Sequence, residues 1–165
     1  MRKVADLVGV SAPAIYRHYR NKEELLQEVV VEGLRVLERY LQPALEDGTP
    51  YGRLVQMTEN YLQFAIEQPK YFDFAFLTPS KVGGMAEEIS RSDWGTFRIA
   101  VEQVAACIEQ GVFKKDDPLA TAITVWAEVH GLVILYRTGR FGDDAESFRL
   151  IYRQSVRRML RGLEV

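Results

Sequence analysis

The sequence has little of the chemistry on which enzymes and secreted proteins depend. Cys107 is the one cysteine among 165 residues, which excludes an internal disulfide and any metal site built from paired cysteines. The two histidines, His18 and His130, lie far apart in the chain, and no motif of a zinc protease, serine hydrolase or phosphate-binding glycine loop is present. We therefore expect no enzymatic activity, no bound metal and no cofactor.

Long hydrophobic runs are also lacking. No uninterrupted apolar segment approaches the roughly 20 residues that a membrane span needs, and the N-terminus has no apolar core of a signal peptide. The composition is 47% hydrophobic, enough to bury a core in one domain or in a small headpiece joined to a larger body. We expect a soluble, cytoplasmic protein without a membrane partner.

Strand patterns are missing as well, because no segment alternates polar and apolar residues for long enough. Apolar residues instead recur every three or four positions, and glycines and prolines divide this pattern into segments. The predicted helices cover residues 2–8, 12–19, 22–45, 51–67, 71–77, 94–110, 118–138 and a last segment ending at 163. The fold class that follows is all-α.

The excess of acidic charge is small and unevenly placed. The net charge is −2 for the whole chain. Residues 1–22 carry five basic side chains against one acidic side chain, Asp6, so this segment is +4 and the remainder is −6. Because phosphate attraction acts over about 8 Å at physiological salt, a basic head on an acidic body still permits binding to a polyanion.

The stretch from residue 2 to residue 26 specifies a geometry with a known use. Gly9 stands where a helix C-terminus takes positive φ, Ser11 can cap the next helix, and Pro13 falls in its first turn. Ile15 and Tyr19 lie four residues apart and face inward, which leaves the other side of this helix free. The pattern predicts a helix-turn-helix whose second helix reads DNA.

These residues resemble the TetR-type transcriptional regulators. The family pattern Ala-x-x-x-Gly-Val-Ser, then Tyr-x-x-Tyr/Phe, then Lys-Glu-Glu-Leu is filled by Ala5, Gly9, Val10, Ser11, Tyr16, Tyr19, Lys22, Glu23, Glu24 and Leu25. A weaker match, Trp126-x-x-x-His130-Gly131, resembles one C-terminal subgroup of that family. The pattern starts at the family's second helix, so we expect that its first helix is absent from this sequence or lies upstream of Met1.

The resemblance implies a homodimer on a palindromic operator, with a small molecule in the body changing the separation of the two reading helices. It implies phosphate contacts from Tyr16, His18 and Lys22 and base or backbone contacts from Ser11, Ala12, Pro13, Ala14 and Arg17. Because residues 12–14 have no polar side chains, direct base readout would rest mainly on Arg17. The simpler alternative for Tyr16 is an exposed aromatic residue without a DNA contact.

The helices of the body carry many aromatic residues on faces that we expect to surround a cavity. An apolar or amphipathic small molecule would suit the set as a whole, although plain core packing is the better explanation for any single residue. His130 would orient the ligand or hydrogen-bond within the helix pair. The predicted ligand-binding residues are Met57, Tyr61, Phe64, Phe72, Phe76, Trp94, Phe97, Val101, Trp126 and His130.

The last two predicted helices carry more apolar surface than one small body can cover. We therefore expect an antiparallel pair that packs on its copy in a second subunit, giving a four-helix interface. The predicted interface residues are Ile123, Leu132, Tyr136, Phe148, Tyr152, Val156, Met159 and Leu160.

Together these patterns predict two parts, a DNA-binding headpiece of residues 1–24 and a ligand-binding and dimerisation domain of residues 25–165. The expected partners are double-stranded operator DNA, a small-molecule effector and a second copy of the chain. The predicted function is that of a ligand-responsive transcriptional repressor. The alternative is a helical dimer that senses a ligand or binds a protein without binding DNA.

Overall fold

The computed structural model describes residues 1–46, 48–77 and 95–165. These ranges contain helices and an isolated bridge between Phe113 and Glu164, so the predicted all-α class is confirmed. The α-helices are α1 (Arg2–Val8), α2 (Ala12–Tyr16), α3 (Lys22–Leu41), α4 (Pro50–Glu67), α5 (Pro69–Phe76), α7 (Gly95–Glu109), α8 (Pro118–Arg137) and α9 (Ala145–Leu163).

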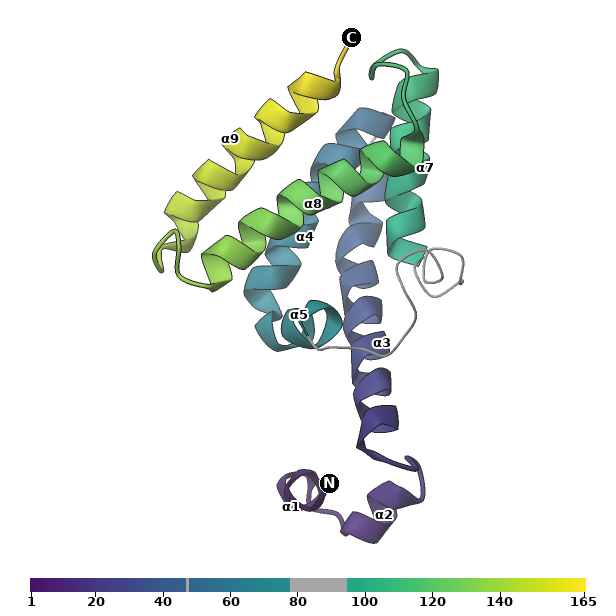
Figure 1. Ribbon diagram of the computed structural model, residues 1–165, viewed down its shortest axis with the longest axis vertical. Helices are drawn as coiled ribbons and strands as arrows, with labels where there is room; N and C mark the ends of the chain where they lie inside the picture. Colours follow the sequence, from purple (N-terminus) through teal and green to yellow (C-terminus); the bar gives the residue numbers. More distant parts are fainter. Residues whose placement is uncertain (47, 78–94) are drawn as a thin grey trace.

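The headpiece stands apart from the body, and α3 joins the two (Figure 1). The 20 residues of α3 correspond to a helix about 30 Å long. The predicted boundary after residue 24 falls in the first turn of this helix. Head and body are therefore connected by a continuous helix and not by a loop.

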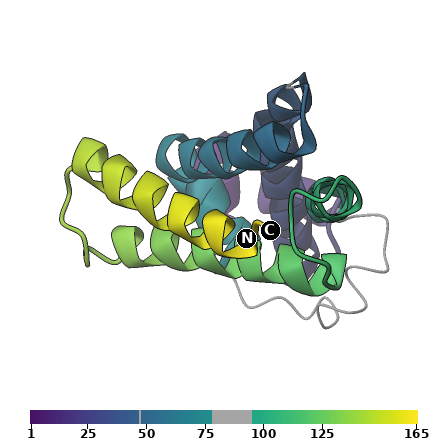
Figure 2. The ribbon, with the colours of Figure 1, turned by 90° about the horizontal axis from the view of Figure 1, so that it is seen from above.

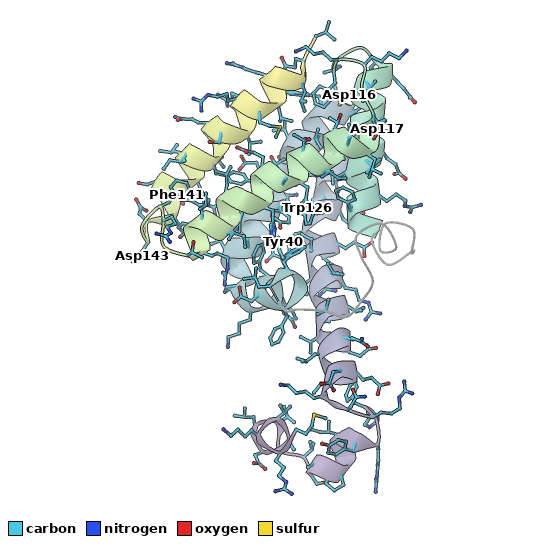
Figure 3. All side chains as sticks on the ribbon, viewed as in Figure 1. Tyr40, Asp116, Asp117, Trp126, Phe141 and Asp143 are labelled. Atoms are coloured by element: carbon cyan, nitrogen blue, oxygen red, sulfur yellow. The ribbon has the colours of Figure 1, made fainter. Side chains whose placement is uncertain are left out.

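Polar caps fix the starts of these helices. The side chains of Ser11, Asn21 and Asp117 accept hydrogen bonds from the backbone N–H groups of residues 14, 24 and 120, at 3.3, 2.8 and 2.7 Å. Asp117 lies at the start of α8 in Figure 3. Gly9 ends α1 with φ 71°, as its position in the sequence predicts.

Two predicted helix ends are wrong. The helix predicted to reach residue 45 ends at Leu41, and a 3-10 helix (Gln42–Glu46) follows. Pro43 in this segment has no backbone N–H to donate to the α-helical ladder, although the apolar spacing continues past it. The reading helix likewise ends at Tyr16 and not at residue 19, but Ile15 is buried as predicted.

The body is built around α4, whose neighbours α3, α5, α7 and α8 pack on it. Leu54, Leu62 and Phe64 of α4 have almost no exposed surface. Seen from above, α8 and α9 lie side by side as an antiparallel pair (Figure 2). The hydroxyl of Tyr152 on α9 donates to the carbonyl of Thr58 on α4 at 2.7 Å, which ties this pair to the centre of the body.

By length and composition α8 could cross a membrane, and among the described residues it is the helix that meets this test. Its mean hydropathy is 1.5 over the relevant window, and 28% of that window is buried in the subunit. Core helices of water-soluble proteins also pass such a test. The large hydrophobic side chains that α8 leaves exposed are Leu119 and Leu135.

Candidate DNA-binding surface and ligand cavity

The residues predicted to contact DNA lie on α2, on the turn after it and at the start of α3. Tyr16 is 53% exposed, and Arg17, His18 and Lys22 are exposed beside it. Ser11 and Pro13 are exposed at the start of α2, where Ala12 and Ala14 are half-buried. The exposed basic side chains thus follow α2, which itself has no polar side chain before Tyr16, and the hydroxyl of Ser11 is already used as the helix cap.

The turn before α3 is held by an acidic side chain. The Glu24 carboxylate accepts from the backbone N–H of Arg20 and forms an ion pair with the Arg20 side chain. These contacts hold the pKa of Glu24 below its usual value. Lys22, by contrast, has no described carboxylate partner, so its ammonium group is available to a phosphate.

The body contains a cavity of about 70 Å³ lined by helices α3, α4, α5, α7 and α8. Among the described residues, its wall consists of hydrophobic side chains apart from the hydroxyls of Thr58 and Tyr61 and the indole N–H of Trp126. Trp126, labelled in Figure 3, comes from the middle of α8. The lining residues are Leu34, Leu37, Leu41, Leu54, Met57, Thr58, Tyr61, Phe76, Phe97, Ala100, Ala122, Val125, Trp126 and Val129.

The predicted ligand residues divide into three groups. Met57, Tyr61, Phe76, Phe97 and Trp126 line the cavity. Phe64 and Phe72 are fully buried and pack in the core, and neither Val101 nor His130 belongs to the cavity wall. Trp94 lies outside the described residues.

His130 sits behind the cavity in a cluster of aromatic rings. Its Nδ1 atom lies 2.7 Å from the hydroxyl of Tyr61, and its ring packs against Phe72, Phe76 and Trp126. Burial lowers the pKa of His130, so its neutral form is favoured. Burial likewise raises the pKa of Tyr61 well above its ordinary range. His130 of α8 is thus hydrogen-bonded to α4, and its role in orienting a ligand stays a prediction.

The cavity residues that the sequence did not single out are mostly aliphatic. Leu34, Leu37 and Leu41 of α3 belong to the wall, as do Ala100 and Ala122. Their spacing is that of any core-facing helix residue, so no signal in the sequence separates them from ordinary core.

A second hollow of about 480 Å³ lies between α4 and α9. It is a wide groove with a polar rim, where Arg153 of α9 pairs with Glu59 of α4 at 2.9 Å. The groove is larger than the cavity but more polar, so the cavity is the better match to an apolar ligand.

Most of the residues predicted to form the dimer interface pack within their own subunit. Phe148, Tyr152, Val156 and Leu160 of α9 and Leu132 of α8 are buried in the single chain, which corrects their assignment to an interface. Tyr136 stacks on Phe148 with ring centroids 4.2 Å apart. Ile123, Tyr136 and Met159 are half-buried. The apolar side chains that these two helices expose near their connecting turn are instead Leu135, Leu150 and Ile151.

Comparison with known families matches both parts of the chain. Residues 1–29 match the model of bacterial regulatory proteins of the tetR family, and residues 54–161 match the tetracyclin repressor-like C-terminal domain. The chain belongs to the TetR family. These regulators bind DNA and are not enzymes, so this TetR-family chain is a DNA-binding transcriptional regulator. The subgroup indicated by the Trp126–Gly131 motif stays a prediction.

Solved structures share the fold of this TetR-family protein. A Rhodococcus sp. RHA1 protein of unknown function is 22% identical, with a TM-score of 0.80 over 99% of this chain and 84% of that one. PfmR, a TetR family transcriptional regulator from Thermus thermophilus, is 23% identical, with a TM-score of 0.73 over 99% and 88%. A TetR/AcrR regulator from Thermobifida fusca is 22% identical, with a TM-score of 0.63 over 98% and 85%. No curated protein matches the chain.

Proposed function

We propose that this TetR-family protein is a repressor that binds a palindromic operator as a homodimer and is released by a small apolar or amphipathic effector. The observation that carries the proposal is the span of α3. Its first residue, Lys22, belongs to the DNA-facing surface, and Leu34, Leu37 and Leu41 further along the same helix line the cavity. A change in the cavity wall therefore acts on the helix that carries the head.

The homodimer is supported by the uncovered surface of α8 and α9. Leu150 is 61% exposed, and Leu135 and Ile151 on the same helix pair are also exposed. Apolar side chains left exposed on a monomer can form an interaction site, and a second copy of the same pair would cover them with like surface. The pairing predicted from sequence therefore stays a proposal, with its contacts on the outer faces of the two helices.

The test is recovery of duplex DNA by the purified protein from fragments of its own genome, followed by footprinting of the recovered site. We expect a palindromic site of two half-sites about one helical turn apart, because two-fold related reading helices enter successive major grooves. Addition of an effector should release the protein. Recovery of no preferred sequence would favour the alternative, a dimeric module that senses a ligand without reading DNA.

A further inference from the structure

The described polar side chains of the cavity wall are engaged within the protein. The hydroxyl of Thr58 donates to the carbonyl of Val55 at 2.7 Å. The indole N–H of Trp126 acts beside the hydroxyl of Tyr61 as a donor that favours a lower pKa of that hydroxyl. The Tyr61 hydroxyl also lies 2.7 Å from Nδ1 of His130, so its hydrogen bond is made within the protein. Each described polar side chain of the wall therefore has a partner within the protein.

The described part of the wall also carries no charge. None of the 14 described side chains that line the cavity is acidic or basic, and the ion pair of Arg137 with Asp73, at 2.6 Å, is not part of this lining. The Arg137 guanidinium lies over the ring of Phe72, 5.4 Å from the centroid, and its Nε atom is buried without a hydrogen-bond partner among the described residues, but Arg137 is not among the lining residues. A charged ligand group in the cavity would therefore meet no described lining side chain of opposite charge.

We infer that the cavity takes an uncharged hydrocarbon group and rejects ligands that bring a carbonyl, a carboxylate or an ammonium into it. This inference rests on the proposed function and narrows it, because an amphipathic effector would have to keep its polar end outside the cavity. A buried acceptor without a donor loses its hydrogen bonds to water and gains none in return.

The size of the cavity adds a second constraint. A dry apolar cavity of about 150 Å³ holds benzene in an engineered protein, whereas this cavity measures about 70 Å³. A ring-shaped ligand can therefore enter only if side chains of the wall move aside. Met57 is the unbranched, flexible side chain of the wall, and it is the residue best able to move aside.

The experiment compares four probes that share one small ring: cyclopentane, cyclopentanone, cyclopentanecarboxylate and cyclopentylammonium. Binding to the full chain without DNA is followed by calorimetry and by the shift in melting temperature. We expect cyclopentane to bind at least about tenfold more tightly than cyclopentanone and the two ions to show no saturable binding. Carboxylate or ketone binding as tight as that of cyclopentane would overturn the inference.

Two variants locate the site. Ala100→Leu fills the cavity and should abolish cyclopentane binding, whereas Ala106→Leu, half-buried on the same helix but outside the wall, should retain it. Met57→Gln places an amide donor in the wall and should reduce the preference for cyclopentane over cyclopentanone several-fold. Because this readout is a ratio within one variant, a loss of stability does not affect it.

Different results would contradict effector release from the operator and the hydrocarbon selectivity of the cavity. Cyclopentane binding that leaves operator binding unchanged would contradict effector release but support the hydrocarbon selectivity. Absence of binding by all four probes would overturn the selectivity, while repression by DNA binding would still be open to the footprinting test.

Discussion

Lys22 and Tyr16 present exposed side chains at the junction of α2 and α3. We expect Lys22→Ala to weaken binding of all DNA sequences about equally and to lower the slope of log affinity against log salt by about 1, because one phosphate contact is lost. Tyr16→Phe should weaken binding without changing that slope. Fluorescence anisotropy over a salt series measures both, with Lys70→Ala in the body as the control.

Arg17 is the polar side chain left to read bases beside the apolar residues 12–14. Arg17→Ala should therefore reduce the preference for operator over random DNA by about ten- to a hundredfold, more than it reduces random-sequence binding. Competition binding with matched duplexes measures the ratio. An unchanged ratio would place base readout elsewhere in the headpiece.

His130 links stability to pH. Burial lowers its pKa below the ordinary value of 6.5, so below that value the unfolded chain binds a proton that the folded chain does not. The free energy of unfolding should therefore fall as the pH drops through this window. His130→Asn should flatten the fall in urea titrations between about pH 7.5 and about pH 5.5. His18→Asn, on the exposed headpiece, is the control.

At the residue scale, caps were predictable and cavity walls were not. Ser11, Asn21 and Asp117 act as the N-caps that their short polar side chains predict. Leu34 and Ala122 were missed because a residue facing a cavity and one facing packed core obey the same spacing. The aromatic residues were better guides, since Tyr61, Phe76, Phe97 and Trp126 of the predicted ligand residues do line the cavity.

At the scale of elements, α3 and α5 cross closely at Gly33. A Cβ built there would lie 3.1 Å from the carbonyl oxygen of Tyr71 and 3.4 Å from the Cβ of Ala75. Gly33→Ala should lower the melting temperature despite the better helix propensity of alanine, because the contact is with backbone. Gly162→Ala, with nothing within 4 Å, should be neutral or stabilise by up to about 1 kcal/mol.

The faces of the last two helices could be predicted only in part. Helical spacing correctly groups Phe148, Tyr152, Val156 and Leu160 on one side of α9, but it does not say which surface that side meets. The structure buries the group within the subunit. Deciding between a core and an interface requires the position of α4, which comes from contacts distant in sequence such as that of Tyr152 with Thr58.

At the scale of the whole molecule, the proposed dimer depends on Leu150 and Ile151. Replacing both with Glu should lower the mass measured by light scattering to that of one chain, 18.9 kDa, because charge on an apolar interface is left desolvated. Leu119→Glu is the control. Leu119 lies about 160° around α8 from Leu135, which belongs to the proposed interface with Leu150 and Ile151. Glu at Val156 or Leu160 would be a poor test, because both residues belong to the core of their own subunit.

Because α3 separates head and body, the charge of the molecule is distributed asymmetrically along its length. A head of +4 stands about one 30 Å helix away from a body of −6. The negative field of DNA attracts the basic head and repels the acidic body, so it orients the protein before the two molecules are in contact. Most collisions then arrive head first, and added salt should slow association more than it speeds dissociation.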